Sequence, residues 1–438
     1  MKLHNFILEN SILPMGDIVL GTEYISTLRK WRKIQNYSEL ELKELQEKNL
    51  RNLLDHVQQN IPFYKKFVSG SGRLELKDLP VLTKPIIRDN IDSMLWHPDR
   101  KHKLISEKSS GSSGIQGEVF VSRKEQSVFQ AIQTLTWEWA GYRPGRSLLQ
   151  TGMTLNRGVV KSIKDFLFNT QYVSAFNLDQ KSVGDVLKEL NRQTLFFGGY
   201  ASSLWVFAEA AKALNINDLK FEGVISWGDK MFPHYRVRIE EQFNTRVYDT
   251  YGTTEGFMIA GQKDLPYHYI LTPHVYLELL DGKGNEVPDG EMGHVVVTRL
   301  DAYEMPLIRY YLGDLAIKLP RDKYPEKRDL QFPLLEKIIG RDTDIVRTRS
   351  GKRMIVHFFT GIFEHAPEIL QFRVIQHSLD EMTIEYIPRD IFSSVVLDVL
   401  TKKIHDYLQE QLPITFVKVE SIPSTSSGKP QIILSTIK

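Results

Sequence analysis

Short apolar runs that alternate with helical segments most constrain the fold of this chain. Strand-like runs occupy residues 118–121, 147–150, 194–197, 223–227 and 246–249. Apolar residues with helical spacing follow at 124–140 and 202–213, and a further helix opens at Pro233, because proline suits a first helical turn. Strands that alternate with helices predict α/β layering, in which ligands bind at the carboxyl ends of the strands.

Two other regions extend this pattern toward the N-terminus. A capping box at Ser38 and Glu41 begins a helix that runs through Val57. Residues 76–90 contain two prolines and scattered charge, which predicts an extended connection without regular structure.

From residue 276 onward the sequence pattern changes. Residues 276–319 predict a β-rich, partly antiparallel module. Strands near 372–375, 383–387 and 416–419, with a long helix at 391–412, predict a compact α+β unit at the C-terminus. Since single cores stop growing at roughly 250–300 residues, the 438-residue chain is expected to be multi-domain, of mixed α/β and α+β class.

Composition excludes several kinds of partner. Lys and Arg number 56 against 54 Asp and Glu, so a net charge of +2 provides no field for nucleic acid. The absence of cysteine removes disulfides, thiolate metal sites and a cysteine nucleophile. No run approaches the roughly 18 apolar residues of a membrane span, and the first residues lack a signal-peptide core. We therefore expect a cytoplasmic enzyme or binding protein, of undetermined oligomeric state.

A hexapeptide rich in serine and glycine is the first candidate site. Glycine lets the backbone approach a ligand closely, while serine hydroxyls and amide groups supply donors for phosphate oxygens. Taken alone, the same composition is also typical of a flexible linker. The residues are Ser109, Ser110, Gly111, Ser112, Ser113 and Gly114.

Three further stretches carry polar groups that suit a nucleotide. The first, Tyr251, Gly252, Thr253, Thr254, Glu255 and Gly256, follows a predicted strand. Glu255 is either a hard oxygen ligand for Mg²⁺ or an ordinary turn carboxylate. Asp314 ends a β segment as an acid that can accept two ribose hydroxyls, or as a Gly-Asp turn. Lys429 lies in a Ser/Gly-rich stretch near the C-terminus.

Other common sites are poorly supported. The serine stretch lacks the Gly-x-x-x-x-Gly-Lys-Ser/Thr pattern of a P-loop and the Gly-x-Ser-x-Gly elbow of a serine hydrolase. His268 and His274 lie near each other in sequence, but no third ligand stands at a diagnostic metal-site spacing.

The order of the motifs SSGSSG, YGTTEG, RYYLGD, IGRDTD and TSSGK resembles that of the adenylate-forming enzymes, the acyl-CoA synthetase and luciferase superfamily. LKDLPVLTKPIIRDN and HVQQNIPFYKKF resemble its phenylacetate–CoA ligase branch, which includes CapK-like proteins. The resemblance covers about His56 to Lys429. It implies an adenylation domain over residues 1–339, a hinge at 340–344 and a small mobile domain at 345–438 that carries the lysine loop.

The resemblance also implies a two-step ligase reaction. A carboxylate attacks the α-phosphorus of MgATP to give an acyl adenylate and pyrophosphate, and a thiol or amine then displaces AMP. Ser109 to Gly114 would hold the β- and γ-phosphates, and Thr254 the α-phosphate. Glu255 would bind Mg²⁺, and Asp314 would bind the ribose hydroxyls. Arg341 would approach ribose or phosphate, and Lys429 would stabilise the charge of the adenylation transition state.

By the same resemblance, Gly228 and Asp229 would line the adenine pocket, beside the loop with Tyr251, Gly252 and Thr253. The acyl pocket would be walled by segments containing Trp137, Gly199, Tyr200, Trp227 and Phe257, each of which is also an ordinary core residue type. Two positions depart from the family pattern: Gln116 replaces a basic residue or proline, and the hinge reads Gly340-Arg341-Asp342-Thr343-Asp344.

Three functions stay open at this point. The first is a carboxylate–CoA ligase, with ATP, Mg²⁺ and CoA as cofactors. The second is a CapK-like enzyme that passes the acyl group to an amine or a carrier protein in polysaccharide or natural-product biosynthesis. The third is a non-catalytic nucleotide-binding relative, suggested by Gln116 and the altered hinge.

Overall fold

The chain divides into two compact units, which are described separately. The structure is a computed structural model that describes residues 3–68, 72–108, 118–152, 158–174, 180–190, 194–341, 345–350, 352–363, 365–423 and 431–437. The larger unit includes Ile115–Leu312 and Ile317–Lys337, and the smaller includes Gly313–Ala316 and Ile338–Lys438. The division thus falls just before the expected hinge, of which residues 342–344 lie outside the described ranges.

A mixed sheet of eleven strands forms the main layer, in the order β10-β11-β12-β13-β9-β8-β7-β6-β5-β3-β4. Its last five strands are parallel to one another: β7 (Val247–Gly252), β6 (Gly223–Trp227), β5 (Phe196–Tyr200), β3 (Leu148–Gly152) and β4 (Thr170–Ser174). The α/β prediction is confirmed here, because four of these strands match predicted runs. The structure adds β4, which the sequence reading missed.

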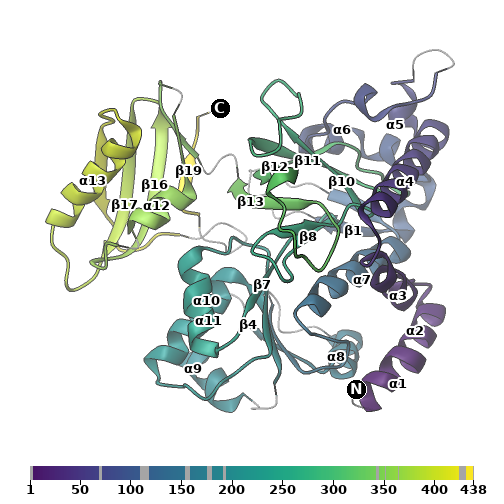
Figure 1. Cartoon of the computed structure of the whole chain (residues 1–438), viewed down its shortest axis with the longest axis horizontal. Coiled ribbons are helices and arrows are strands. Elements are labelled where there is room, and N and C mark those ends of the chain that lie inside the picture. Colours follow the sequence, from purple (N-terminus) through teal and green to yellow (C-terminus); the bar gives the residue numbers. More distant parts are fainter. Residues whose placement is uncertain are drawn as a thin grey trace. The chain divides into compact units, whose positions relative to one another are not determined.

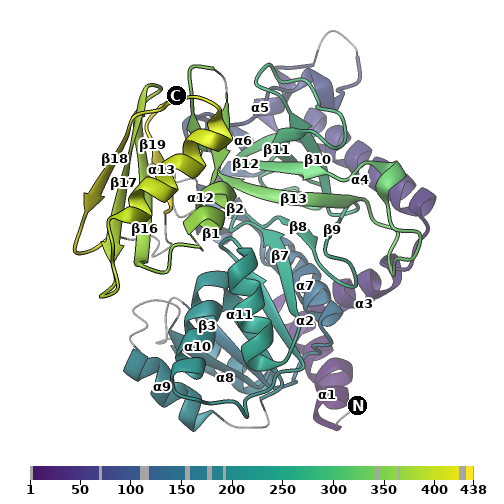
Figure 2. The same ribbon diagram turned by 60° about the vertical axis from the view of Figure 1, so that its left-hand side comes forward.

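Crossover helices connect the parallel strands, as parallel pairing requires. Helices α10 (Ala201–Ala213) and α11 (Pro233–Phe243) lie side by side, as Figures 1 and 2 show. Two others, α8 (Gly158–Leu167) and α9 (Gln180–Glu189), were not predicted. The proline predicted to open a helix at position 233 does open α11.

The other half of the sheet is largely antiparallel, as predicted for residues 276–319. It contains β8 (Met258–Gly261), β9 (His268–Ile270), β10 (Val275–Leu280), β11 (Met292–Arg299), β12 (Tyr310–Lys318) and β13 (Leu334–Arg341). β7 and β8 pair antiparallel, with an irregularity between Tyr251 and Gly252. Strand direction therefore changes at the loop that joins β7 to β8.

Helices dominate the N-terminal part of the larger unit. They are α1 (Leu3–Ile7), a π-helical turn (Leu8–Ile12), α2 (Leu13–Leu20), α3 (Tyr24–Ile34), α4 (Glu39–Asn60), α5 (Pro62–Lys65), α6 (Lys84–Met94) and α7 (Arg123–Trp139). Helix α4 begins with the predicted capping box: Ser38 Oγ accepts the Glu41 amide, and the Glu41 carboxylate accepts the Ser38 amide at 2.7 Å. Short 3₁₀ turns occupy Leu76–Asp78, Pro98–Lys103 and Arg321–Lys323.

The prediction of an extended connection at 76–90 was wrong. The segment contains a 3₁₀ turn and the start of α6. Pro85 lies in the first turn of α6, where its missing amide is not needed, so it initiates the helix instead of preventing it. Between the two elements, Leu82 forms a parallel bridge with Tyr310 at the start of β12.

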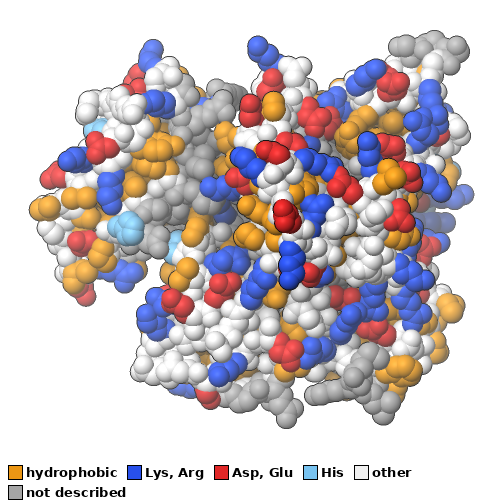
Figure 3. All heavy atoms as spheres, viewed as in Figure 1, with side chains coloured by type: hydrophobic (Ala, Val, Ile, Leu, Met, Phe, Trp, Pro, Cys, Tyr) orange, Lys and Arg blue, Asp and Glu red, His pale blue; other side chains and the backbone are white. Residues whose placement is uncertain are grey.

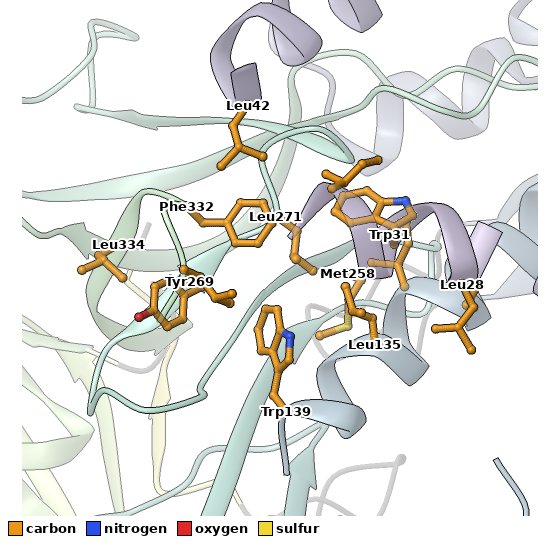
Figure 4. Close-up of a cluster of buried hydrophobic side chains, with 14 of the residues drawn as sticks. Leu28, Trp31, Leu42, Leu135, Trp139, Met258, Tyr269, Leu271, Phe332 and Leu334 are labelled. Atoms are coloured by element: carbon orange, nitrogen blue, oxygen red, sulfur yellow. The ribbon is translucent and has the colours of Figure 1, made fainter. Parts of the chain in front are cut away.

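A large hydrophobic cluster joins the N-terminal helices to the sheet (Figure 4). Trp31 of α3 and Leu135 and Trp139 of α7 belong to it, together with Met258 of β8 and Tyr269 of β9. Met258 is 1% exposed and is the first residue of the strand that follows the β7–β8 loop. The carboxyl side of this loop is therefore anchored in the core.

The smaller unit contains a four-stranded sheet with the order β18-β17-β16-β19. Its elements are β14 (Ile345–Arg347), β15 (Arg353–Ile355), α12 (Val356–Phe363), β16 (Ile369–Ser378), β17 (Glu381–Pro388), α13 (Val395–Leu408), β18 (Ile414–Lys418) and β19 (Ile433–Ser435). The predicted strands and long helix are confirmed as β16, β17, β18 and α13, with α13 shorter than predicted at both ends.

Acidic and basic side chains are interspersed on the face of the molecule drawn in Figure 3, in keeping with the small net charge. Within the described ranges, no helix has the length and apolar character needed to cross a membrane.

Candidate functional site

Three parallel strands bring most of the predicted site residues to one edge of the main sheet. β5 ends at Tyr200, β6 at Trp227 and β7 at Gly252. Tyr200 pairs in register with Trp227, so the ends of β5 and β6 are level. Since all three strands run in the same direction, the residues that follow them emerge at the carboxyl edge, where open α/β sheets bind ligands.

The loop from Thr253 to Phe257, here called the β7–β8 loop, is closed by backbone hydrogen bonds. The Thr253 amide donates to the Phe257 carbonyl at 2.8 Å, and the Gly256 amide to the Thr253 carbonyl at 3.2 Å. Gly256 has a φ of +91°, which favours glycine. Gly252 is also required, because a Cβ there would stand 2.7 Å from the Phe257 carbonyl oxygen.

Glu255 is buried at the centre of this loop, whereas Thr254 is exposed. Its Oε1 accepts the Tyr310 hydroxyl at 3.0 Å, and its Oε2 accepts the Thr254 hydroxyl over a longer 3.4 Å. Because an ionised carboxylate has about four acceptor positions, these bonds leave capacity for another ligand. Sequence reasoning gave Tyr310 no role, since its contact with Glu255 spans 55 residues.

The groups present fit a magnesium ion that is shared with phosphates. No group of three or more His, Asp or Glu clusters as a metal site among the residues that the structure describes. Mg²⁺ does not need such a cage, because it usually takes one or two carboxylates together with substrate phosphates and waters. Thr253 Oγ1 is buried and has no hydrogen-bond partner within the described ranges, which leaves a hydroxyl for a ligand oxygen in the same loop.

The backbone before Tyr310 is held in an uncommon conformation. Arg309 has a φ of +55°, a left-handed value that costs about 1 kcal/mol or more for a non-glycine residue. Its guanidinium pairs with Glu278 at 3.0 Å and donates to the Leu79 carbonyl at 2.9 Å. Burial raises the pKa of Glu278, although Arg309 opposes the rise. These contacts fix the point from which the Tyr310 side chain reaches Glu255.

Asp314 and Arg341 bind each other in this structure. Asp314 lies on β12 and Arg341 ends β13, and Arg341 Nε stands 3.1 Å from Asp314 Oδ1. Asp314 is only 9% exposed. Asp314, the predicted acceptor of the ribose hydroxyls, is therefore already paired with a cation. That cation is Arg341, the residue predicted to approach ribose or phosphate.

Gly228 and Asp229 follow β6, and both have a local structural role. Gly228 has a φ of +80°, and a Cβ on it would stand 2.6 Å from the Tyr200 ring. Asp229 Oδ2 accepts the Ser202 amide at 3.2 Å and also the Ser202 hydroxyl. This carboxylate caps the N-terminus of α10, whose own N-cap residue, Tyr200, makes no side-chain capping bond. Burial, with a smaller contribution from Asp229, raises the pKa of Tyr200.

The predicted acyl-pocket residues form two separate aromatic contacts. Trp137 and Trp227 stack with ring centroids 5.3 Å apart, and the Trp227 indole covers Gly198, where a Cβ would stand 2.7 Å from its ring. Phe257, fully buried, instead stacks on Tyr310 at 6.0 Å. The Trp137 Nε1–H is buried without an acceptor among the described residues. Gly199 packs against Thr151, with no room for a side chain.

Two predicted elements lie outside the described residues. Ser109 to Gly114 fall within residues 109–117, and Lys429 falls within 424–430. The strands on either side of the serine stretch are described: β1 (Ile105–Lys108) pairs antiparallel with β2 (Glu118–Val121), and Lys108 stands opposite Glu118. The predicted strand at 118–121 is thus confirmed, outside the main sheet.

Comparisons with solved structures identify the fold. A 2-hydroxyisobutyryl-CoA ligase in the postadenylation state, in complex with 2-HIB-AMP, superposes with a TM-score of 0.69, at 18% identity, over 90% of this chain and 89% of that one. The chain has the adenylate-forming fold. ATP-bound MatB from Rhodopseudomonas palustris shares this fold with a TM-score of 0.54, at 16% identity, over 74% of this chain and 66% of MatB.

Sequence comparisons refine the relationship. Residues 345–436 match the CapK C-terminal domain family. Phenylacetate-coenzyme A ligase from Thermus thermophilus is 22% identical, over 91% of this chain and 97% of that enzyme. The enzyme of the same name from Aromatoleum evansii is 25% identical, over 72% and 74%. The resemblance of this chain to the phenylacetate–CoA ligase and CapK-like branch is therefore confirmed.

Proposed function

We propose that the chain is an ATP-dependent acid–CoA ligase that works through an acyl adenylate. One observation carries the proposal: a buried carboxylate, Glu255, is fixed by Tyr310 in a polar loop at the carboxyl ends of the parallel strands. Fold and relatives support the same chemistry, since phenylacetate–CoA ligases align along most of the chain.

In the proposed first step, an oxygen of the acid carboxylate forms a bond to the α-phosphorus of ATP. The bond from that phosphorus to the bridging oxygen breaks, and pyrophosphate leaves. Mg²⁺ would supply positive charge to the phosphate oxygens. Glu255 would hold the ion, while the hydroxyls of Thr253 and Thr254 would bind phosphate oxygens.

Ribose and transition-state charge would be bound elsewhere in the chain. Asp314 would accept the ribose hydroxyls, which requires Arg341 to share or leave this carboxylate. Lys429 and the serine stretch would balance the charge of the phosphates. Position 116, beside the serine stretch, carries a neutral glutamine instead of a basic residue. In the second step the thiol of CoA attacks the acyl carbonyl and AMP leaves.

The test is acid-dependent exchange of labelled pyrophosphate into ATP, over a panel of aryl, fatty and hydroxy acids. We expect exchange with at least one acid and its loss in Glu255→Gln. Thioester formation is then followed by mass after CoA is added. A broad panel that gives no exchange would refute the ligase and favour a nucleotide-binding relative without catalysis.

A second candidate keeps the adenylation step and transfers the acyl group to an amine or a carrier protein. The match of residues 345–436 to the CapK C-terminal domain favours it. Exchange without thioester, followed by amide formation when an amine is supplied, would select this candidate over the CoA ligase.

A further inference from the structure

Three charged or polar side chains, two of them buried, form a cluster beneath the β7–β8 loop. His274 precedes β10, Arg299 ends β11, and Asp301 follows two residues later. His274 and Arg299 are 0% and 2% exposed. Among the residues that the structure describes, Arg299 is the largest fully buried side chain, and a buried guanidinium is costly unless it is fully paired.

His274 connects the loop to the cluster. Its Nε2 accepts the backbone amide of Met258 at 3.2 Å, directly after the loop, and its Nδ1 lies 2.5 Å from Asp301 Oδ2. Since Nε2 accepts from a backbone N–H, the ring proton is on Nδ1 and is donated to Asp301. The ring also packs edge-on against Trp31 of the core cluster, with centroids 6.5 Å apart. This imidazole thus holds one backbone amide in place.

Arg299 supports the other side of the loop. Its Nε donates to Asp301 Oδ1 at 2.7 Å, and its Nη2 donates to the Glu125 carbonyl of α7 at 2.6 Å. Its Nη1 occupies the space where a Cβ on Gly256 would stand. The loop therefore rests on a guanidinium that is itself held from two directions.

We infer that His274, Arg299 and Asp301 position the β7–β8 loop for adenylation, so that Glu255 meets Mg²⁺ and ATP at a fixed place. Glu255 immediately precedes Gly256, which packs on Arg299, and Met258 is bound by His274. The carboxylate is thereby held between Tyr310 on one side and this support cluster on the other. The inference rests on the proposed function for the identity of the ligand.

A role in folding alone is the competing explanation, and matched variants separate the two. His274→Leu removes both hydrogen bonds at similar volume. His274→Gln keeps one acceptor and one donor and serves as the conservative rescue. Glu9→Gln is the control, because Glu9 is also buried and is paired with Arg32 of α3 at 2.7 Å rather than with a residue of the loop.

Each variant is measured for thermal unfolding, for MgATP dependence of exchange and for hydrogen exchange at the Met258 amide. We expect His274→Leu and Asp301→Asn to raise the half-saturating Mg²⁺ concentration or lower kcat by about 10–100-fold, as loss of groups that orient metal ligands usually does. The KM for the acid should stay unchanged. His274→Gln should recover most of the loss, and Glu9→Gln should lower only the unfolding temperature.

The inference is overturned if His274→Leu changes stability as Glu9→Gln does but leaves Mg²⁺ dependence and Met258 amide protection as in wild type. If His274→Leu does not fold, Asp301→Asn and Arg299→Lys give the same comparison. Failure of the proposed function is recognised separately, because wild type would then show no exchange with any acid. In that event, binding of a non-hydrolysable MgATP analogue by the same variants decides the inference.

Discussion

Tyr310 donates its hydroxyl to Glu255 across 3.0 Å, and this bond joins the first residue of β12 to the β7–β8 loop. Tyr310→Phe removes the donor and keeps the ring that stacks on Phe257. We expect it to slow exchange by roughly tenfold, because loss of this hydrogen bond should cost about 1.4 kcal/mol, which corresponds to a factor of ten in rate. Glu255→Gln should cost far more, since it removes the negative charge offered to Mg²⁺. Equal rates for Tyr310→Phe and wild type would show that the bond does not position the carboxylate.

Asp229 provides a test that separates a cap from an adenine contact. Asp229→Ala should lower the free energy of unfolding by about 1 kcal/mol, because α10 loses its capping carboxylate. Asp229→Asn keeps an acceptor and should leave stability nearly unchanged. If Asp229 also binds adenine, Asp229→Asn raises the KM for ATP while the unfolding curve stays in place. If the KM for ATP is unchanged, Asp229 acts only as the cap of α10.

Trp137 offers a buried donor beside a stacked aromatic pair. Trp137→Phe keeps an aromatic ring next to Trp227 and removes the Nε1–H, which lacks an acceptor among the described residues. If the acyl group supplies that acceptor, the KM for the acid should rise about fivefold, the equivalent of roughly 1 kcal/mol. The KM for ATP should not change. An acid KM equal to that of wild type would place the acyl group elsewhere.

Asp301 predicts a distinct step in acid stability. Burial opposes its ionisation, but His274 and Arg299 outweigh this effect and lower its pKa from 3.8 to about 2. Because the pKa is lower in the folded state, ionised Asp301 stabilises the fold at pH values above its ordinary pKa. This contribution to the free energy of unfolding is lost as pH falls from about 4 to about 2. A quarter of the side chain is exposed, so we expect about 1–2 kcal/mol. In urea unfolding, Asp301→Asn should be less stable than wild type at pH 5, and the difference should disappear near pH 2.

Lys429 should act on the transition state more than on nucleotide binding. Lys429→Ala is expected to slow exchange by about 100–1,000-fold, the usual cost of one donor to developing charge. The dissociation constant for ATP, measured by calorimetry, should change little. A large loss of ATP affinity together with an unchanged maximal exchange rate would assign the lysine to ground-state binding instead.

The sequence was sufficient to predict the layers, because strand and helix periodicities are local and repeat along the chain. It also predicted that YGTTEG would follow a strand; β7 includes Tyr251 and Gly252, and the remaining four residues follow it at its carboxyl end. Helix α6 was not predicted because its segment contains prolines, yet Pro85 stands in the first helical turn, a position that proline favours.

Contacts between residues that lie far apart in the sequence could not be predicted from local patterns. Tyr310 reaches Glu255, Asp229 caps a helix that begins before it in the chain, and His274 binds the Met258 amide. No local pattern marks such pairs, because each depends on which strands become neighbours. The left-handed φ of Arg309 was likewise invisible, since arginine is not a residue that signals this conformation.

The reversal of strand direction between β7 and β8 limits how the loop can change. Met258 lies in the core, and β8 is held in register with both β7 and β9. An insertion or deletion of one residue that shifts the pairing register of β8 by one would turn every side chain of β8 to the opposite face of the sheet. Point substitutions at exposed Thr254 leave this register intact. Relatives with different chemistry should thus differ in the residue types of the loop while its length is preserved. Differences in length should occur mainly in connections that do not lead into a buried strand.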